Sequence, residues 1–270
     1  MWNTRQKKPG VTRHAHYVSI LAHRGGSDGR FPENSIAAFA EGLRCGADVL
    51  ELDVRLCRDG HVVVIHDPVV TIDGTGERGV DTMGHREMEN GTRRGDAGIP
   101  TLPEVLARFP GNRFNIDLKV DTPALAVRVA EHLRSSGATH RSVVASFLPR
   151  ALDYFRRVAP EVATSTHPGE VRSFLLRHFI GVRPSSPAYA LQIPLRHRSI
   201  PLVTRRFVSY AHRHGYAVHV WTINDPTEAV RLAEMGVDGI VTDRVGVIHD
   251  ALSERGFRRG AGQQDTKESR

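Results

Sequence analysis

The segment Val49–Asp67 reads VLELDVRLCRDGHVVVIHD. It contains two extended runs rich in β-branched residues, Val49–Leu56 and Val62–Ile65, which are separated by a short Asp-Gly turn. Such a turn ordinarily makes an antiparallel hairpin, and the runs leave no room for a helix between them. A closed parallel barrel can therefore include both runs only if the first bends after Asp53, so that its later part returns toward the far rim.

On both sides of this segment, short extended runs alternate with amphipathic helical stretches, several of which end in glycine as helices commonly do. This alternation is typical of an α/β protein with a mainly parallel sheet, and the number of runs favours a closed barrel. We therefore expect a (β/α)8 TIM-type barrel over residues 17–252. The extended runs outside the opening segment are Tyr17–Ala22, Arg113–Leu118, Ser142–Ser146, Val162–Thr166, Ala190–Ile193, Ala217–Trp221 and Gly239–Thr242.

A segment of weak periodicity follows the second run of the hairpin. Residues 68–99 are rich in Gly, Thr, Asp, Glu and Arg. A loop of this length is more often functional than incidental. We therefore expect a short insertion after the third strand, lying over the mouth of the barrel.

The basic charge of the chain is concentrated at its two ends. The formal net charge is +7, and residues 1–16 carry four basic side chains and no acidic one. Residues 254–270 carry five basic and three acidic side chains, so the two ends together hold +6. We expect flexible tails at 1–16 and 253–270. We expect no specific nucleic-acid partner, because the sequence contains no nucleic-acid-binding motif.

The sequence also favours a particular cellular setting. It contains no apolar run of about 18 residues, so we expect no transmembrane segment. Its first residues lack the apolar core of a secretory signal, which favours a cytoplasmic protein. Cys45 and Cys57 are the only cysteines, too few for a disulfide framework. The oligomeric state leaves no signal in the sequence.

Polar side chains gather at the ends of the predicted strands. Glu51 and Asp53 stand two residues apart in an extended run, so both carboxylates point to the same side. Asp117 and Lys119 share a strand face in the same way. In a β/α barrel the loops at the C-terminal strand ends build the active site, so polar residues there are candidates for catalysis. Other side chains in such positions are His23, Arg24, His66, Asn115, His219 and Trp221.

Each of these groups alone has a simpler interpretation. The two carboxylates could form an ion-paired rim, Trp221 could belong to the core, and Asn34 and Ser35 could cap the first helix. Together they define one chemistry. Hard carboxylates without thiolates suit Mg²⁺ or Ca²⁺, with Mn²⁺ as a further candidate. Arginine and lysine suit the oxygens of a phosphate, and two histidines suit proton transfer.

These residues belong to a series of motifs that resembles the glycerophosphodiester phosphodiesterase family, which is related to phosphatidylinositol-specific phospholipase C-like phosphodiesterases. The resemblance covers Ile20 to Val245 and leaves both tails outside. In their order and spacing the motifs are highly specific. They are HRG (23–25), PENS (32–35), ELDV (51–54), DGHVVVIHD (59–67), PTLPE (100–104), DLK (117–119), WTIN (221–224) and GIVTD (239–243).

The resemblance implies a β/α barrel with an inserted segment and a role for each matched residue. His23 and His66 match the acid–base histidine pair of the family. Glu51 and Asp53 match its divalent-metal carboxylates. The third metal ligand is usually a glutamate, and this sequence has Asp117 there. The side chain is one methylene shorter, so Asp117 either binds through water or favours a different cation.

The remaining matched residues concern the substrate. Arg24 and Lys119 match the phosphate-binding cations of the family, and Trp221 matches an aromatic residue that lines the glycerol end of the substrate. The implied activity is metal-dependent hydrolysis of a small-molecule glycerophosphodiester to glycerol 3-phosphate and an alcohol. By resemblance to phosphatidylinositol-specific phospholipases, the nucleophile could be the neighbouring glycerol hydroxyl of the substrate.

Two other interpretations compete with this one. A lysophospholipase D-like enzyme of the same superfamily would need an apolar acyl groove. The segment Gly181–Leu195 could help to line it through Tyr189, Leu191, Ile193 and Leu195. A non-catalytic anion-binding protein would use the basic tails and a degenerate barrel, and the intact histidines and carboxylates argue against it.

Overall fold

The computed structural model describes residues 17–74, 76–91 and 98–258. Eight parallel strands form a nearly closed barrel in the order β8-β7-β6-β2-β1-β13-β12-β9. A parallel bridge between Ser165 and Ala190 joins the two edge strands. The predicted β/α barrel is therefore confirmed. The strands are β1 Ser19–Ala22, β2 Val49–Leu56, β6 Arg113–Leu118, β7 Ser142–Ala145, β8 Ala163–Thr164, β9 Ala190–Pro194, β12 Ala217–Trp221 and β13 Gly239–Thr242.

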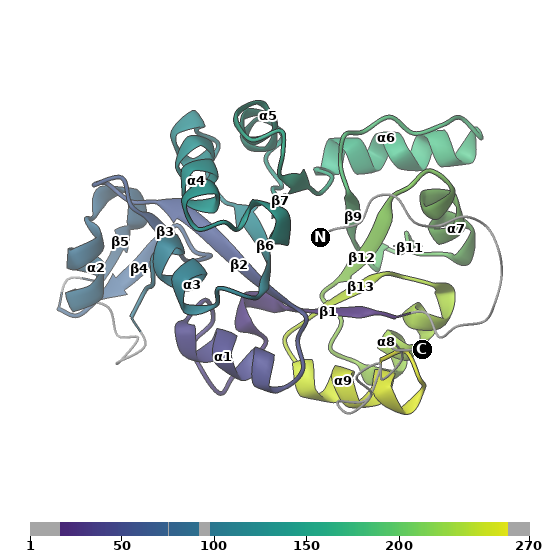
Figure 1. The fold of residues 1–270 in the computed structure, drawn as a ribbon, viewed down its shortest axis with the longest axis horizontal. Helices are drawn as coiled ribbons and strands as arrows, with labels where there is room; N and C mark the ends of the chain where they lie inside the picture. Colours follow the sequence, from purple (N-terminus) through teal and green to yellow (C-terminus); the bar gives the residue numbers. More distant parts are fainter. Residues whose placement is uncertain (1–16, 75, 92–97, 259–270) are drawn as a thin grey trace, which may run out of the picture.

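Helices surround the strands as a ring (Figure 1). Several begin with a proline in the first turn after a residue whose side chain caps the helix, as Thr122 and Asp225 do. Their apolar faces pack on the outer faces of the strands and form the main core. The helices of the ring are α1 Ile36–Arg44, α3 Leu102–Arg108, α4 Pro123–Ser135, α5 Pro149–Val158, α6 Pro168–Phe179, α7 Arg205–Arg213, α8 Pro226–Met235 and α9 Val245–Glu254.

The inside of the barrel is apolar only at one level. Leu21, Val49 and Val241 form a small buried cluster there, and Trp221 packs against it. Nearer the C-terminal strand ends, the interior positions carry Glu51 and other polar side chains. The barrel interior therefore has an apolar layer, with polar side chains between this layer and the C-terminal strand ends.

The hairpin in the opening segment does not interrupt the barrel. β3 (Val62–Val64) pairs antiparallel with the end of β2, with Val54 opposite Val64 and Leu56 opposite Val62. β3 lies off the path of the eight closing strands, so the barrel does not need the bend expected after Asp53. The return along β3 brings His66 back to the pocket at the barrel mouth.

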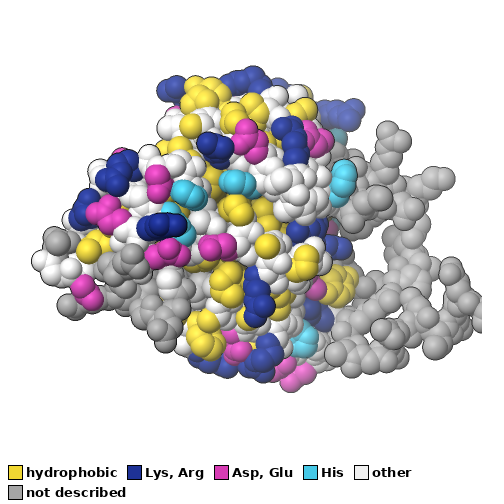
Figure 2. Space-filling view, turned by 60° about the vertical axis from the view of Figure 1, so that its left-hand side comes forward, with side chains coloured by type: hydrophobic (Ala, Val, Ile, Leu, Met, Phe, Trp, Pro, Cys, Tyr) yellow, Lys and Arg dark blue, Asp and Glu magenta, His cyan; other side chains and the backbone are white. Residues whose placement is uncertain are grey.

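The insertion has its own small core. β4 (Val69–Ile72) and β5 (Gly76–Gly79) form an antiparallel pair, and α2 (His85–Gly91) follows them. The insertion lies to the side of the barrel, next to β3, on a face where basic, acidic and histidine side chains are mixed (Figures 1 and 2). The described part of the insertion contributes no residue to the pocket lining, in contrast to the expected position over the mouth. Its core consists of Cys57, Val63, Ile65, Val70, Ile72, Val80, Met83, Met88 and Ile99.

The packed chain continues beyond the expected domain boundary at residue 252. Phe257 packs against the main core, and Arg258 donates to a carboxylate oxygen of Asp48 at 2.6 Å. Residues 1–16 and 259–270, which contain most of both predicted tails, lie outside the described residues. No helix among the described residues is long and apolar enough to cross a membrane. A short hairpin of β10 (Arg196–His197) and β11 (Ile200–Pro201) follows β9.

Candidate active site

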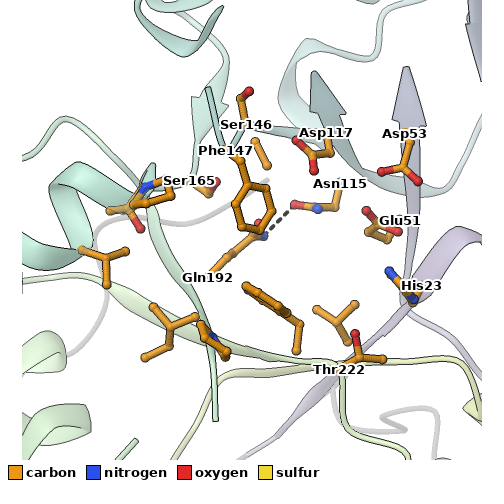
Figure 3. Close-up of a pocket in the computed structure, with 18 of the residues that line it drawn as sticks. His23, Glu51, Asp53, Asn115, Asp117, Ser146, Phe147, Ser165, Gln192 and Thr222 are labelled. Carbon is orange, nitrogen blue, oxygen red and sulfur yellow. Dashed lines mark hydrogen bonds between the residues drawn. The ribbon is translucent and has the colours of Figure 1, made fainter. Parts of the chain in front are cut away.

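A pocket of about 620 Å³ opens at the C-terminal ends of the barrel strands (Figure 3). Its lining comes from most of the strands, from α6 and from the loops that follow the strands. The structure brings together at this pocket every residue to which the family resemblance assigned a role. These residues are His23, Arg24, Glu51, Asp53, His66, Asp117, Lys119 and Trp221.

Three buried carboxylates lie on the neighbouring strands β2 and β6. In the parallel register Glu51 stands beside Asn115, and Asp53 beside Asp117. Burial raises the pKa of Glu51, and the nearby charge of Asp53 raises it further. Burial also raises the pKa of Asp117. The cluster therefore concentrates more negative charge than its surroundings can stabilise fully.

Asp53 is the best-paired carboxylate of the three. Asn34 donates its amide to Asp53 Oδ2 at 3.0 Å, and the Asp53 backbone N–H donates to Asn34 Oδ1 at 3.2 Å. Lys119 Nζ lies 2.9 Å from Asp53 Oδ1. Burial opposes the charge of Asp53, but Lys119 and Asn34 outweigh it and lower its pKa below the usual value. Ser35 alone caps α1, so the expected capping role of Asn34 is wrong.

The two predicted phosphate-binding cations are both held by carboxylates. Lys119 Nζ donates to Asp117 Oδ2 at 2.6 Å in addition to its contact with Asp53. Arg24 donates through Nη1 to both carboxylate oxygens of Glu33, at 2.9 and 3.1 Å. Its backbone N–H donates to Glu51 Oε2 at 2.8 Å. Arg24 Nε also lies 3.1 Å from Asp53 Oδ2, so carboxylates of the cluster and Glu33 together orient the two cations.

The turn that presents His23 and Arg24 depends on a close approach to α1. A Cβ built on Gly42 would lie 2.2 Å from the carbonyl oxygen of Gly25, and one built on Gly25 would lie 2.5 Å from the Ala38 side chain. Gly25 also has a φ of +103°, which side chains with a Cβ rarely adopt. Both glycines are therefore required for the turn to pack on the helix.

His23 is positioned by a carboxylate from the neighbouring strand end, because Asp243 directly follows β13, which pairs with β1. Its Nδ1 lies 2.6 Å from Asp243 Oδ1, and Asn224 holds Asp243 by donating to Oδ2 at 2.7 Å. Burial lowers the pKa of His23, but the hydrogen bond with Asp243 and the charge of Glu51 outweigh it and raise the pKa. Because Nδ1 is engaged, Nε2 is the ring nitrogen left for a substrate.

His66 is oriented in a comparable way. Its Nδ1 lies 2.8 Å from Asp67 Oδ1, and its side chain is more exposed than that of His23. Asp67 and Asp243 both stand inside the motifs of the sequence, yet the sequence assigned neither a role. The sequence gives a hint only for Asp67, because Asp67 directly follows His66, whereas Asp243 is far from His23 along the chain.

A neutral polar network lies below the carboxylates. Gln192 donates to Asn115 Oδ1 at 2.6 Å and lies 3.3 Å from His219 Nδ1. Burial lowers the pKa of His219 to about 4. His219 is therefore neutral near pH 7, and this network supports the pocket without adding charge.

The opposite side of the pocket is apolar. Trp221 packs edge to face with Phe147, with ring centroids 5.5 Å apart, and Lys119 Nζ lies 5.7 Å from the Phe147 ring centroid. Pro168, Val171 and Leu175 of α6 continue this wall, with Ile193 and Leu202. Of the four residues expected to line an acyl groove, Ile193 lines the pocket, although it belongs to the buried main core as Leu191 does. The sequence did not indicate the contribution of α6.

The carboxylate cluster has the donor set of a site for a hard divalent cation. All candidate ligands are carboxylate oxygens, which Mg²⁺ and Ca²⁺ prefer. Asp117 Oδ1 is buried and has no hydrogen-bond partner among the described residues. A cation would also favour the ionised forms of Glu51 and Asp117, whose pKa values are raised by burial. The residues therefore fit such a group.

Residues 23–247 match the sequence profile of the Glycerophosphoryl diester phosphodiesterase family. The chain belongs to this family. A Mycobacterium tuberculosis protein named "Probable glycerophosphodiester phosphodiesterase 2" is 33% identical over 92% of this chain and 96% of its own length. The family resemblance and the enzyme class predicted from the motifs are thus confirmed.

Solved structures of the same family share the fold. A glycerophosphodiester phosphodiesterase from Agrobacterium tumefaciens has a TM-score of 0.71 and 26% identity, covering 86% of this chain and 99% of that one. An Oleispira antarctica phosphodiesterase in complex with the product sn-glycerol-3-phosphate has a TM-score of 0.69 and 25% identity, covering 88% and 97%. The fold of this chain is therefore similar to that of solved phosphodiesterase structures.

Glycerophosphodiester phosphodiesterases generally use divalent cations. Among the described residues, the group of metal-type ligands whose candidate donor atoms all lie within 4.8 Å of one another is a different one, Cys57, Asp59 and His61. These residues surround the turn between β2 and β3, and none of them lines the pocket. The donors already pair among themselves, since Asp59 Oδ1 accepts from Cys57 and contacts His61. The carboxylate cluster therefore remains the candidate site for the catalytic cation.

Proposed function

We propose that this protein hydrolyses glycerophosphodiesters to glycerol 3-phosphate and an alcohol in the pocket at the barrel mouth. One observation carries the proposal. Three carboxylates, two cations and two histidines from distant parts of the chain converge on a single pocket in a member of the glycerophosphodiester phosphodiesterase family. The cytoplasmic location expected from the sequence stays a prediction.

The acidic cluster holds the metal in this proposal. Glu51, Asp53 and Asp117 bind a divalent cation, Mg²⁺ or Ca²⁺ with Mn²⁺ as a further candidate. When bound, the cation supplies Lewis-acid stabilisation of the charge on the phosphodiester. Arg24 and Lys119 border the same cluster, so a phosphate that enters the pocket there is bound by their guanidinium and ammonium groups.

The histidines move the protons of the reaction. His23, fixed by Asp243, and His66, fixed by Asp67, present Nε2 to the substrate from different strand ends. One accepts the proton of the nucleophile and the other donates a proton to the leaving alkoxide. Trp221 and Phe147 provide a rigid apolar wall for the glycerol part of the substrate.

A lysophospholipid is a second candidate substrate, and the apolar part of the pocket lining favours it. Val171 and Leu175 of α6 and Ile193 add to the wall that Trp221 and Phe147 form. An acyl chain that lies along this wall would bury apolar surface that water otherwise covers. We therefore include a lysophospholipid among the substrates to be tested.

The decisive test is an assay of the purified protein for glycerol 3-phosphate release. Glycerophosphocholine, glycerophosphoethanolamine and glycerophosphoglycerol are compared, each with Mg²⁺, Mn²⁺ or Ca²⁺. A lysophospholipid is assayed in parallel for release of its headgroup alcohol. We expect metal-dependent turnover of at least one glycerophosphodiester. No turnover of any of these substrates with any of the three metals would contradict the proposal.

A further inference from the structure

One long stretch of the barrel carries basic side chains and no acidic one. Between Val171 and Asn224 the sequence contains eight arginines and no lysine, aspartate or glutamate. This stretch therefore carries +8, more than the net charge of the whole chain. It comprises most of α6, the β9–β11 region, α7 and β12. The chain between the two basic ends has a net charge close to zero, but its positive and negative side chains are unevenly distributed along it.

Exposed apolar side chains gather in the same region. Leu176, Phe179, Ile180 and Val182 are 62, 81, 62 and 46% exposed, and they lie within seven residues at the end of α6. Single exposed apolar residues are ordinary on protein surfaces, whereas a cluster of this size marks an interaction site. The helix that carries this cluster is packed on the barrel, because Phe174 on the other face of α6 contacts Phe207 and Tyr210 of α7.

The exposed cluster continues the wall of the pocket. Pro168, Arg172 and Leu175 line the pocket from α6. Phe179 follows Leu175 by four residues and therefore lies on the same side of the helix. Leu175 in the pocket wall and Phe179 on the surface thus form one apolar stripe along α6. A surface that covers Phe179 would therefore lie one helical turn beyond the wall that α6 contributes to the pocket.

Arginines frame this stripe. Arg172, Arg177 and Arg183 belong to α6 and the loop that follows it, and none of them forms an ion pair with a carboxylate among the described residues. Burial lowers the pKa of His178, and the charges of Arg213 and Arg206 lower it further, which places these two arginines of α7 near α6 as well. The apolar cluster is thus surrounded by unneutralised positive charge.

We propose that this α6–α7 face, defined by residues 171–183 and 205–213, docks on a phospholipid bilayer that contains anionic lipids. Leu176, Phe179 and Ile180 enter the boundary between headgroups and acyl chains, and the arginines lie among the headgroup phosphates. The wall that α6 contributes to the pocket then lies close to the lipid–water interface. The proposal concerns where the enzyme works and does not depend on which diester it hydrolyses.

Two other occupants fit the face less well. A nucleic acid would pair with the arginines but would leave the apolar tips of Phe179 and Ile180 without a suitable environment. A second copy of the chain would place two strongly positive faces against each other, and like charges across an interface are unfavourable. A bilayer with anionic headgroups complements both properties of the face at once.

The test is co-sedimentation of the full-length protein with lipid vesicles. Vesicles of phosphatidylcholine alone are compared with vesicles of phosphatidylcholine and phosphatidylglycerol. We expect binding to the anionic vesicles that weakens as salt is added. Phe179→Ser combined with Ile180→Ser should abolish most of it. Arg183→Gln combined with Arg206→Gln should weaken it roughly 30-fold, because each arginine near an anionic surface contributes about fivefold.

Matched variants elsewhere on the surface serve as controls. Val127→Ser on α4 removes an exposed apolar side chain, and Arg86→Gln with Arg108→Gln removes two exposed arginines far along the chain from the face. These variants should bind vesicles as the wild type does. All variants should retain the wild-type circular dichroism and thermal unfolding, which excludes misfolding as a cause of lost binding.

Three results would overturn the proposal. The first is no binding of the wild type to anionic vesicles, and the second is equal binding by the wild type and both α6–α7 variants. The third is that the same variants abolish binding to duplex DNA or RNA, or abolish a dimer seen by light scattering, while vesicle binding is absent. Each of these results can be distinguished from failure of the proposed activity, which is measured with a small glycerophosphodiester in the absence of lipid.

Discussion

Replacement of Asp243 by asparagine tests how His23 is positioned. The substitution keeps the shape of the side chain and its contact with Asn224, but it removes the negative charge 2.6 Å from His23 Nδ1. A hydrogen bond to a charged group contributes about 1.5–3 kcal/mol. The Asp243 side chain is 46% exposed, so solvent screening places the effect near the lower limit. We therefore expect kcat/KM to fall about tenfold, since 1.36 kcal/mol corresponds to a factor of ten.

The pH dependence gives the test its sharpest readout. Asp243 is among the causes that raise the pKa of His23 above its usual value. Removing its charge lowers that pKa, so the limb of the pH–rate profile that reports His23 should move to lower pH. A shift of the acidic limb identifies His23 as the general base, and a shift of the basic limb identifies it as the general acid.

Stability follows the same linkage. A histidine whose pKa is raised by folding contributes stability below its unfolded pKa of about 6.5, and this contribution is lost as the pH rises through the folded value. The hydrogen bonds from His23 and Asn224 outweigh burial and lower the pKa of Asp243, so Asp243 is ionised throughout that range. The loss of unfolding free energy in Asp243→Asn should therefore be larger at about pH 5.5 than at about pH 8.5.

A second His–Asp pair offers a matched control. His249 Nδ1 lies 3.3 Å from Asp250 Oδ1 on α9, and Asp250 is 79% exposed and does not line the pocket. Asp250→Asn should leave kcat/KM and the pH–rate profile unchanged. If Asp243→Asn also leaves both unchanged, Asp243 does not position His23 for catalysis.

Other changes test the rest of the site. Glu51→Ala should abolish activity, and a chelator should abolish wild-type activity reversibly; full turnover in excess chelator would exclude a metal. His66→Ala should lower kcat by roughly 10²–10⁴-fold with an intact circular dichroism spectrum, and near-normal kcat would remove His66 from the mechanism. Asp117→Asn should weaken metal binding in calorimetry, whereas Asp117→Glu should be tolerated or shift the preference between Mg²⁺ and Ca²⁺; an unchanged dissociation constant in the Asn variant would exclude Asp117 as a ligand. Deletion of residues 1–16 and 259–270 should leave kcat/KM for a small substrate within a few-fold of the wild type, and a large loss would show that a tail completes the site.

The position of the site could be predicted from the sequence because strand geometry is regular. Side chains two residues apart on a strand share a face, and the C-terminal ends of parallel strands meet at one rim. These two rules suffice to bring Glu51, Asp53 and Asp117 together. The barrel itself could be predicted from the alternation of extended and helical stretches alone.

The partners of these residues were not predictable, because they depend on the conformation of loops. Arg24 and Asn34 have φ values of +50° and +57°, in the left-handed region that residues other than glycine rarely adopt. No periodic pattern reveals such conformations. The contacts from Asn34 to Asp53 and from Arg24 to Glu33 therefore became visible only in the structure.

The place of β3 and the exposed face of α6 escaped prediction for a related reason. The composition of an extended run does not show whether it is one of the barrel strands or, as β3 is, an additional strand paired with the end of one of them. Only the pairing seen in the structure distinguishes these cases. An amphipathic pattern shows that α6 buries one face, but it does not show that a second stripe lines the pocket. The net charge of the chain likewise does not reveal where the charges lie. The positive charge of the stretch between Val171 and Asn224, which has no acidic residue, is offset by acidic residues elsewhere in the chain.

The charge of the pocket is a physical reason for the proposed dependence of substrate binding on a cation. Four carboxylates face two permanent cations, so with all of them ionised the group carries two negative charges. These residues are Glu33, Glu51, Asp53, Asp117, Arg24 and Lys119. A phosphodiester carries one negative charge and would be repelled by this group. Without a metal the cluster can reduce its charge only by protonation, and the raised pKa values of Glu51 and Asp117 show where the protons would be taken up. In the proposed site protons and a divalent cation would compete for the same oxygens, so metal affinity should fall as the pH is lowered, and the affinity for the diester should fall with it.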